Sequence, residues 1–146
     1  MDFDTEVKLA VYRTTAETGA IPPLQTVASK VGASAGDVKG AYRRLRERRV
    51  LLLEPDGETI RMAPPFSGVP TQHVTAVDGI DYYASCAWDA LAIPAALHRP
   101  GLVRSECAES HEPLRLQVGL EGPEPSTWLF HCLVPAAKWW DDLVYT

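Results

Sequence analysis

The sequence has no long hydrophobic segment and few cysteines. None of its apolar runs approaches the roughly 20 residues that span a bilayer, and its first ten residues carry three acidic side chains and no signal-like apolar run. Only three of the 146 residues are cysteine, and no two of them have the CxxC spacing. These absences argue against a membrane span, a disulfide-stapled secreted domain and a thioredoxin-type or zinc-ribbon motif. We therefore expect a cytoplasmic globular protein with no membrane partner.

The sequence also lacks a strong basic excess. Its formal net charge is -5, with a net of +1 over residues 1–63 and -6 over residues 64–146. Basic surface is what nucleic acid requires. If the protein binds DNA at all, the first 63 residues are where we expect it to bind.

Residues 1–63 have the pattern of a winged-helix-like domain, in which three helices precede a β-hairpin. Apolar residues recur at helical spacing in three segments, and Ser34 followed by Asp37 is a capping-box start for the third. A turn at residues 55–58 then separates two apolar segments of strand length. The predicted helices cover about 4–17, 24–31 and 35–49, and the predicted strands 50–54 and 59–62.

The third helix allows two interpretations. Five arginines crowd its C-terminal end: Arg43, Arg44, Arg46, Arg48 and Arg49. Cations there also stabilise the helix dipole, whereas a recognition helix usually reads bases with its N-terminal residues. Those residues here are Ala35, Gly36, Asp37 and Lys39, a poor set for base contacts. A structural role is favoured, and DNA binding remains the alternative.

The second half predicts a sheet with one helix, which makes the whole chain α+β. A proline-rich joint at residues 64–72 should pack Phe66 inward, and residues 73–146 should form a mixed or antiparallel core. Pro94 should kink or shorten the helix. The predicted strands cover about 73–77, 102–107, 114–118 and 128–134, with a helix over 86–97, a helical turn over 135–142 and a further strand from Leu143 to Thr146.

Cys86 and Asp89 form the clearest candidate site. Ser85 is a plausible N-cap, which places Cys86 in the first helical turn. Backbone N–H groups there stabilise a thiolate, so we expect a lowered pKa for Cys86. Asp89 lies three residues later on the same face and could carry a proton. The alternative is a buried structural cysteine with an acidic residue favoured near the helix start.

A structural zinc site is a weaker possibility. Cys107 and His111, with the later pair His131 and Cys132, could supply four ligands. Adjacent residues on a strand point to opposite faces, which makes a shared site difficult.

Several segments resemble the alkylmercury (organomercurial) lyase family. They are Tyr83-Ala-Ser-Cys-Ala-Trp-Asp-Ala-Leu91, Pro65-Phe-Ser67 with Pro70-Thr71, the strand ending at Cys107, and Val134-Pro-Ala-Ala-Lys-Trp-Trp-Asp-Asp142. The resemblance implies that Cys86 is one of two mercury-binding thiolates and that Asp89 protonates the departing carbon. It assigns Cys107 a structural or secondary thiol role and matches Cys132 to no catalytic position.

The resemblance also implies a partner set. The substrate is an organomercurial, the product Hg(II) stays on sulfur, external thiols are needed, and no cofactor is required. Hand-off of Hg(II) to a mercuric reductase follows from the same likeness. Soft thiolates suit a thiophilic metal, and a carboxyl group can act as a general acid.

The likeness departs from the family where the printed sequence stops. The family's second catalytic cysteine would follow Thr146, and family members continue for several tens of residues beyond it. We expect a fragment, a truncation by mutation, or a UGA codon that encodes selenocysteine. One thiolate alone binds mercury but cannot form the two-thiolate complex. Two other functions stay open: a winged-helix regulator that senses a soft metal or thiol reagent through Cys86, and a lyase-like domain with unrelated chemistry.

Overall fold

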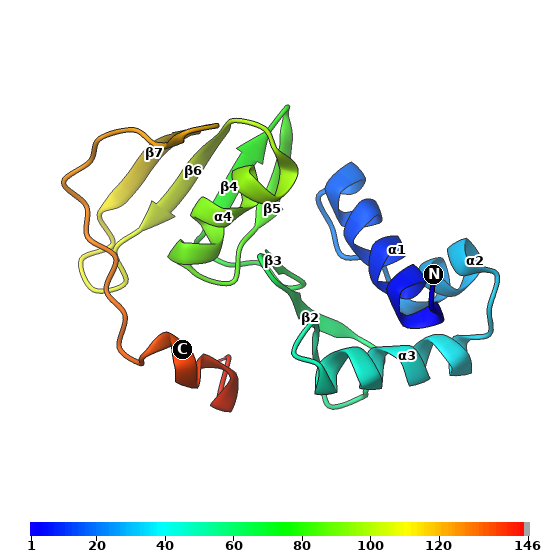
Figure 1. The fold of residues 1–146 in the computed structure, drawn as a ribbon. Helices are drawn as coiled ribbons and strands as arrows, with labels where there is room; N and C mark the ends of the chain where they lie inside the picture. The colour runs from blue at the N-terminus through cyan, green and yellow to red at the C-terminus, as the bar shows by residue number, and fades with distance from the viewer. Residues whose placement is uncertain (145–146) are drawn as a thin grey trace.

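The first part of the chain consists of three helices and a small antiparallel sheet. The computed structural model describes residues 1–144, and Figure 1 shows the helices on one side of the molecule. The strand order of the small sheet is β1-β2-β3. Its third strand comes from the segment that the sequence predicted as a joint. The elements are α1 (Phe3–Thr18), α2 (Leu24–Val31), α3 (Ala35–Glu47), β1 (Leu52–Leu53), β2 (Ile60–Ala63) and β3 (Phe66–Ser67).

The second part is a five-stranded antiparallel sheet with one helix across a face (Figure 1). The strand order is β5-β4-β6-β7-β8. The predicted α+β class is therefore confirmed, while the winged-helix assignment of the first part stays a prediction. The elements are β4 (Val74–Val77), β5 (Ile80–Tyr83), α4 (Ala87–Leu97), β6 (Gly101–Glu106), β7 (Pro113–Gly119), β8 (Gly122–Pro123) and the 3-10 helix η1 (Ala136–Asp141).

Local capping explains where the first helices begin and end. The Ser34 side chain accepts a hydrogen bond from the Asp37 backbone N at 3.1 Å, as the capping-box pattern predicted. Gly32 adopts the left-handed conformation that ends α2. The Asp2 carboxylate accepts from the Thr5 backbone N at 3.1 Å and starts α1.

Two hydrophobic clusters fill the two parts, and α1 connects them. Tyr12 and Ile21 pack against both clusters. Phe66 is 3% exposed, so its predicted inward packing is confirmed. The Tyr82 hydroxyl on β5 donates to the Ala16 carbonyl of α1 at 2.6 Å. The helical part is therefore bonded directly to the sheet that carries α4.

Gly19 allows α1 to end against β5. Its φ of 80° lies in the left-handed region, and a Cβ there would stand 2.6 Å from the Asp81 carbonyl oxygen. Only glycine meets both conditions without strain. Among residues 1–144, no helix is long and apolar enough to cross a membrane.

Two predicted strands are absent from the described residues, and one strand was not predicted. Residues 128–134 form no strand, because β8 pairs with the end of β7 and the chain then leaves the sheet. Leu143 and Val144 lie in a turn rather than a strand, and Tyr145 and Thr146 fall outside the described residues. Strand β5, which the sequence did not predict, pairs with β4 in a tight hairpin around Asp78 and Gly79. The helical turn predicted over residues 135–142 is confirmed as η1.

Helix α4 continues through Pro94 to Leu97, the end that the sequence predicted, so Pro94 does not shorten the helix. Proline has no N–H, which leaves the carbonyl four residues earlier, that of Ala90, without its helical donor. The Thr75 hydroxyl on β4, fully buried, donates to the Ala90 oxygen at 2.8 Å. This bond replaces the lost one and fixes α4 on the sheet.

Replacing Thr75 with valine should show how much the unfolding free energy falls when the Ala90 carbonyl, which Pro94 leaves without a helical donor, has no partner. Thr75→Val keeps the shape but leaves the Ala90 carbonyl unpaired, so the unfolding free energy should fall by about 2 kcal/mol. In a Pro94→Ala background the helix supplies its own N–H, and the same substitution should cost about 1 kcal/mol or less. Urea unfolding of the four proteins in this cycle measures the difference. Equal costs in both backgrounds would show that Thr75 does not compensate for Pro94.

Candidate functional site

Cys86 is the N-cap of α4. The sequence placed the cap at Ser85, one residue too early. Cys86 has extended backbone angles, and its Sγ accepts a hydrogen bond from the Asp89 backbone N at 3.5 Å. The Trp88 backbone N–H also bonds this sulfur. The thiol therefore occupies the position that a serine or aspartate oxygen takes in other caps.

The predicted lowering of the Cys86 pKa is wrong. Burial raises the pKa of this thiol, and it outweighs the two backbone N–H groups, which lower it. The nearby charge of Asp89 raises it further. A half-buried sulfur gains less from the helix start than it loses by leaving water. Cys86 thus keeps its proton until a ligand displaces it.

Asp89 is a carboxyl that stays partly protonated near neutral pH. Burial raises its pKa to about 6, and a hydrogen bond with the Cys86 side chain lowers it by a smaller amount. That bond raises the pKa of the thiol in turn. The two side chains predicted as a site are therefore brought together, close enough for each to shift the pKa of the other.

Tyr12 belongs to the surroundings of this site, and the sequence did not indicate it. Its hydroxyl donates to the Pro64 carbonyl at 3.1 Å, and its ring centroid lies 6.3 Å from that of Phe66. Burial raises the pKa of Tyr12 to about 12, and the charge of Asp89 raises it as well. Helix α1 thus reaches within electrostatic range of a carboxyl that lies 77 residues later. No local pattern could have revealed this.

Ser85 precedes the N-cap of α4 and is not itself the cap that the sequence predicted. Its hydroxyl oxygen is buried, and within residues 1–144 it has no hydrogen-bond partner. A buried hydroxyl without a partner is costly, and this one lies directly before the candidate thiol.

The other two cysteines lie elsewhere. Cys107 follows β6, where hydrogen bonds from Ser110 and from the Glu109 backbone lower the pKa of its thiol. Cys132 is exposed in the segment after β8, and its thiol donates to the Val134 carbonyl at 2.7 Å. Across residues 1–144, no three His, Cys, Asp or Glu side chains gather as a metal site. The predicted set of Cys107, His111, His131 and Cys132 is therefore not brought together.

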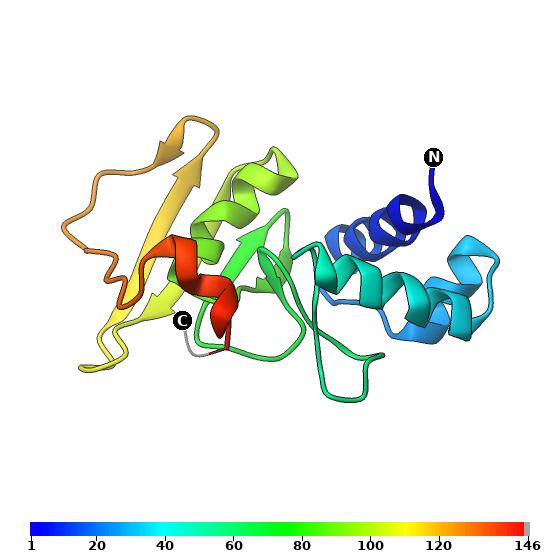
Figure 2. The same ribbon diagram turned by 60° about the horizontal axis from the view of Figure 1, so that its bottom comes forward.

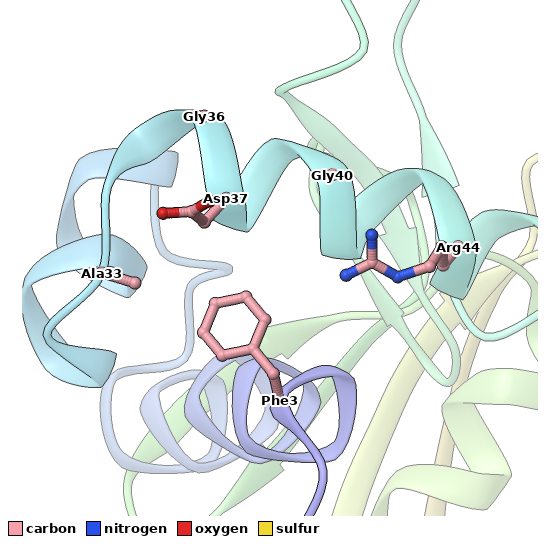
Figure 3. A pocket seen from close by; sticks show the side chains of 6 residues that line it. All are labelled: Phe3, Ala33, Gly36, Asp37, Gly40 and Arg44. Atoms are coloured by element: carbon pink, nitrogen blue, oxygen red, sulfur yellow. The ribbon is translucent and has the colours of Figure 1, made fainter.

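A surface hollow of about 370 Å³ lies on the helical part, away from Cys86. Figure 3 shows Gly36 and Gly40 of α3 above the Phe3 ring, with Asp37 and Arg44 at the two sides. Asp37 is bonded to Ser34 and Arg44 to Asp4, so both charged groups already have partners. This hollow adds nothing to the thiol site.

The fold and the site together define an α+β protein with a cysteine thiol and a protonatable carboxyl paired at a helix start. Comparison with known proteins then gives the family. The sequence model described as alkylmercury lyase matches residues 66–146, more than half of the chain. The chain belongs to the alkylmercury lyase family.

Individual relatives agree with this assignment. The chain is 39% identical to an alkylmercury lyase of Bacillus cereus over 70 residues, 46% of this chain and 32% of that protein. It is 29% identical to an alkylmercury lyase of Staphylococcus epidermidis over 116 residues, 77% of this chain and 51% of that protein. The chain thus spans from about a third to about a half of these relatives' length.

A solved structure supports the fold. The mercury-bound form of MerB2 matches with a TM-score of 0.62 at 23% identity, over 82% of this chain and 59% of that chain. The relatives described here are all lyases, and none is a DNA-binding regulator, so the regulator alternative gains no support from them.

Asp89→Asn should stabilise the protein at neutral pH. Folded Asp89 holds its proton up to a pH of about 6, whereas the unfolded chain releases it near the ordinary value of 3.8. The folded state therefore binds more protons in this window, and the parent loses stability as pH rises through it. Asparagine does not titrate, so the Asp89→Asn variant has no such loss. Its unfolding free energy relative to that of the parent should therefore rise by about 2 kcal/mol between pH 4 and pH 7.

Asp56→Asn is the control of opposite sign. Hydrogen bonds from Thr59 and Glu58 lower the pKa of Asp56. Its carboxylate stabilises the fold above about pH 4 and loses this effect as pH falls. Urea unfolding at several pH values should show that the unfolding free energy of Asp56→Asn falls relative to that of the parent as pH rises. A pH-independent difference for Asp89→Asn would refute the raised pKa.

Proposed function

We propose that this protein carries out the organomercurial lyase reaction, with Cys86 as mercury ligand and Asp89 as proton donor. The observation that supports the proposal is the closeness of the Cys86 thiol and the Asp89 carboxyl, both half-buried at the start of α4. The Asp89 backbone N–H donates to the Cys86 sulfur at 3.5 Å, and each side chain shifts the pKa of the other. One group can hold a soft metal and the other can deliver a proton, and both reactions are needed at the same carbon–mercury bond.

The first step is exchange of mercury between sulfurs. An organomercurial arrives bound to an external thiolate, and the Cys86 sulfur forms a new bond to mercury. The external thiolate leaves, and the proton that Cys86 gives up passes to the Asp89 carboxylate. Because burial keeps Cys86 protonated in the free protein, Asp89 is the nearest acceptor for that proton during exchange. Asp89 is thereby protonated, and it can return this proton in the second step.

The second step breaks the carbon–mercury bond. The carbon takes the electron pair of that bond together with a proton from the Asp89 carboxyl, and a hydrocarbon leaves. Mercury remains as Hg(II) on the Cys86 thiolate and on a thiolate from solution, and Asp89 is left as a carboxylate. Its pKa of about 6 is suited to this work, because general acids act best when their pKa lies near the working pH.

The second sulfur ligand comes from solution in this proposal. Cys107 lies after β6 and Cys132 after β8. The sulfur of each is hydrogen-bonded to a residue of its own segment, Ser110 and Val134, and not to Cys86 or Asp89. Hg(II) then passes by thiol exchange to an acceptor protein, for which a mercuric reductase is the proposed partner. We also propose that these steps take place in the cytoplasm and need no cofactor.

Substitutions at the two residues should separate binding from cleavage. Cys86→Ser should abolish tight mercury binding, because a hydroxyl is a poor ligand for a soft metal. Asp89→Asn should still bind mercury but release hydrocarbon about 100-fold more slowly, the usual loss when a general acid is removed. Phenylmercuric acetate with excess thiol is the substrate; benzene is measured by gas chromatography and bound mercury by elemental analysis after desalting.

Cys132→Ser is the matched control, since it removes an exposed thiol from the segment after β8. It should leave both measurements unchanged. If Cys86→Ser binds mercury as well as the parent, Cys86 is not the ligand. If the parent binds mercury at Cys86 but releases no benzene, the lyase activity of this chain is refuted.

A further inference from the structure

Two aromatic side chains meet beside Cys86, and neither was part of the predicted site. The Trp88 ring of α4 and the Phe130 ring lie with their centroids 5.8 Å apart at an angle of 50°. Phe130 belongs to the segment after β8, which in both ribbon views passes the end of the molecule where α4 begins (Figures 1 and 2). A tilted pair at this distance has the geometry of a favourable aromatic contact.

The pair leaves much of its apolar surface open. Trp88 is 53% exposed and Phe130 is 44% exposed, although each already packs on the other. Large rings exposed next to one another often mark a binding surface. Here the surface stands at the start of the helix that Cys86 caps.

The backbone places Trp88 directly at the thiol. Its own N–H bonds the Cys86 sulfur, and the next residue is Asp89. Side chains on a helix lean towards its N-terminus. Trp88 lies two residues after the candidate thiol at the start of α4, and the Phe130 ring packs on its indole.

We infer that Trp88 and Phe130 form a subsite for the organic group of the mercurial and favour aryl over short alkyl groups. The inference rests on the proposed function, because Cys86 must hold the mercury. Two-coordinate mercury is linear, so its organic group extends directly away from the sulfur towards its surroundings. A flat phenyl ring can stack on the indole or meet the Phe130 edge, whereas a methyl group covers little of either ring.

Other exposed apolar side chains do not offer the same site. Trp128 lines a hollow beside β7 together with Arg115 and Glu124. Leu129, next to Phe130, is 91% exposed. Leu129 is therefore a matched control for an apolar truncation in the same segment.

The test measures how mercurials partition between the protein and glutathione. The protein carries Cys107→Ser and Cys132→Ser, so that Cys86 is its sole thiol. Phenylmercury and methylmercury are each equilibrated with protein and glutathione, and the Cys86 adduct is quantified by native mass spectrometry. The partition is measured in an Asp89→Asn background, in which cleavage is slowed, and dividing the phenyl partition constant by the methyl constant gives the selectivity. Benzene release is measured separately with Asp89 in place.

We expect a selectivity of about tenfold for phenylmercury. Trp88→Ala and Phe130→Ala should each lower it to about twofold or less, while Trp88→Phe should retain most of it and Leu129→Ala all of it. Circular dichroism checks that the variants fold. We expect them to fold, because the substituted side chains are exposed. A parent selectivity near one, no adduct at Cys86, or an equal loss in Leu129→Ala would each overturn the inference. Tenfold selectivity without benzene release would instead overturn the lyase proposal and leave the subsite standing.

Discussion

The arrangement of the site depends on the removal of water from the start of α4. A thiol and a carboxyl are half-buried there side by side, and burial is the largest influence on both pKa values. Burial disfavours charge, so each group holds its proton more firmly than in solution. A helix start exposed to solvent would instead favour the thiolate. The site is therefore better described as a protonated thiol beside a carboxyl that exchanges its proton at a pH of about 6 than as a preformed thiolate.

Features set by neighbouring residues could be predicted from the sequence. The Ser34 and Asp37 cap, the Gly32 stop and the spacing of Cys86 and Asp89 are each contained within four residues. Helix boundaries depend mainly on such local bonds. The α+β class followed from the same local patterns, since three helical segments precede a series of short apolar strands.

Features that join distant residues could not be predicted. The pKa of Cys86 depends on burial by elements packed around α4, and Tyr12 approaches Asp89 from 77 residues away. Thr75 compensates for Pro94 across two elements. The expected strand over residues 128–134 failed for the same reason: apolar alternation indicates a strand only where a sheet edge is free to pair with it. Here β8 occupies the end of β7, and Phe130 packs on Trp88 instead.

The contacts of α1 favour a structural role for the first 63 residues. Tyr12 and Ala16 bond to the segment before β3 and to β5, so α1 is fixed against the sheet that carries α4, within electrostatic range of Asp89. On α3, Arg44 makes hydrogen bonds of 2.7 to 3.1 Å to Asp4, and Arg48 lies 4.0 Å from the same carboxylate. These pairs neutralise part of the arginine cluster that suggested DNA binding. A helical part that is bonded to the sheet and balances much of its own positive charge is what a structural role requires, and α1 provides the contact through Tyr12 and Ala16.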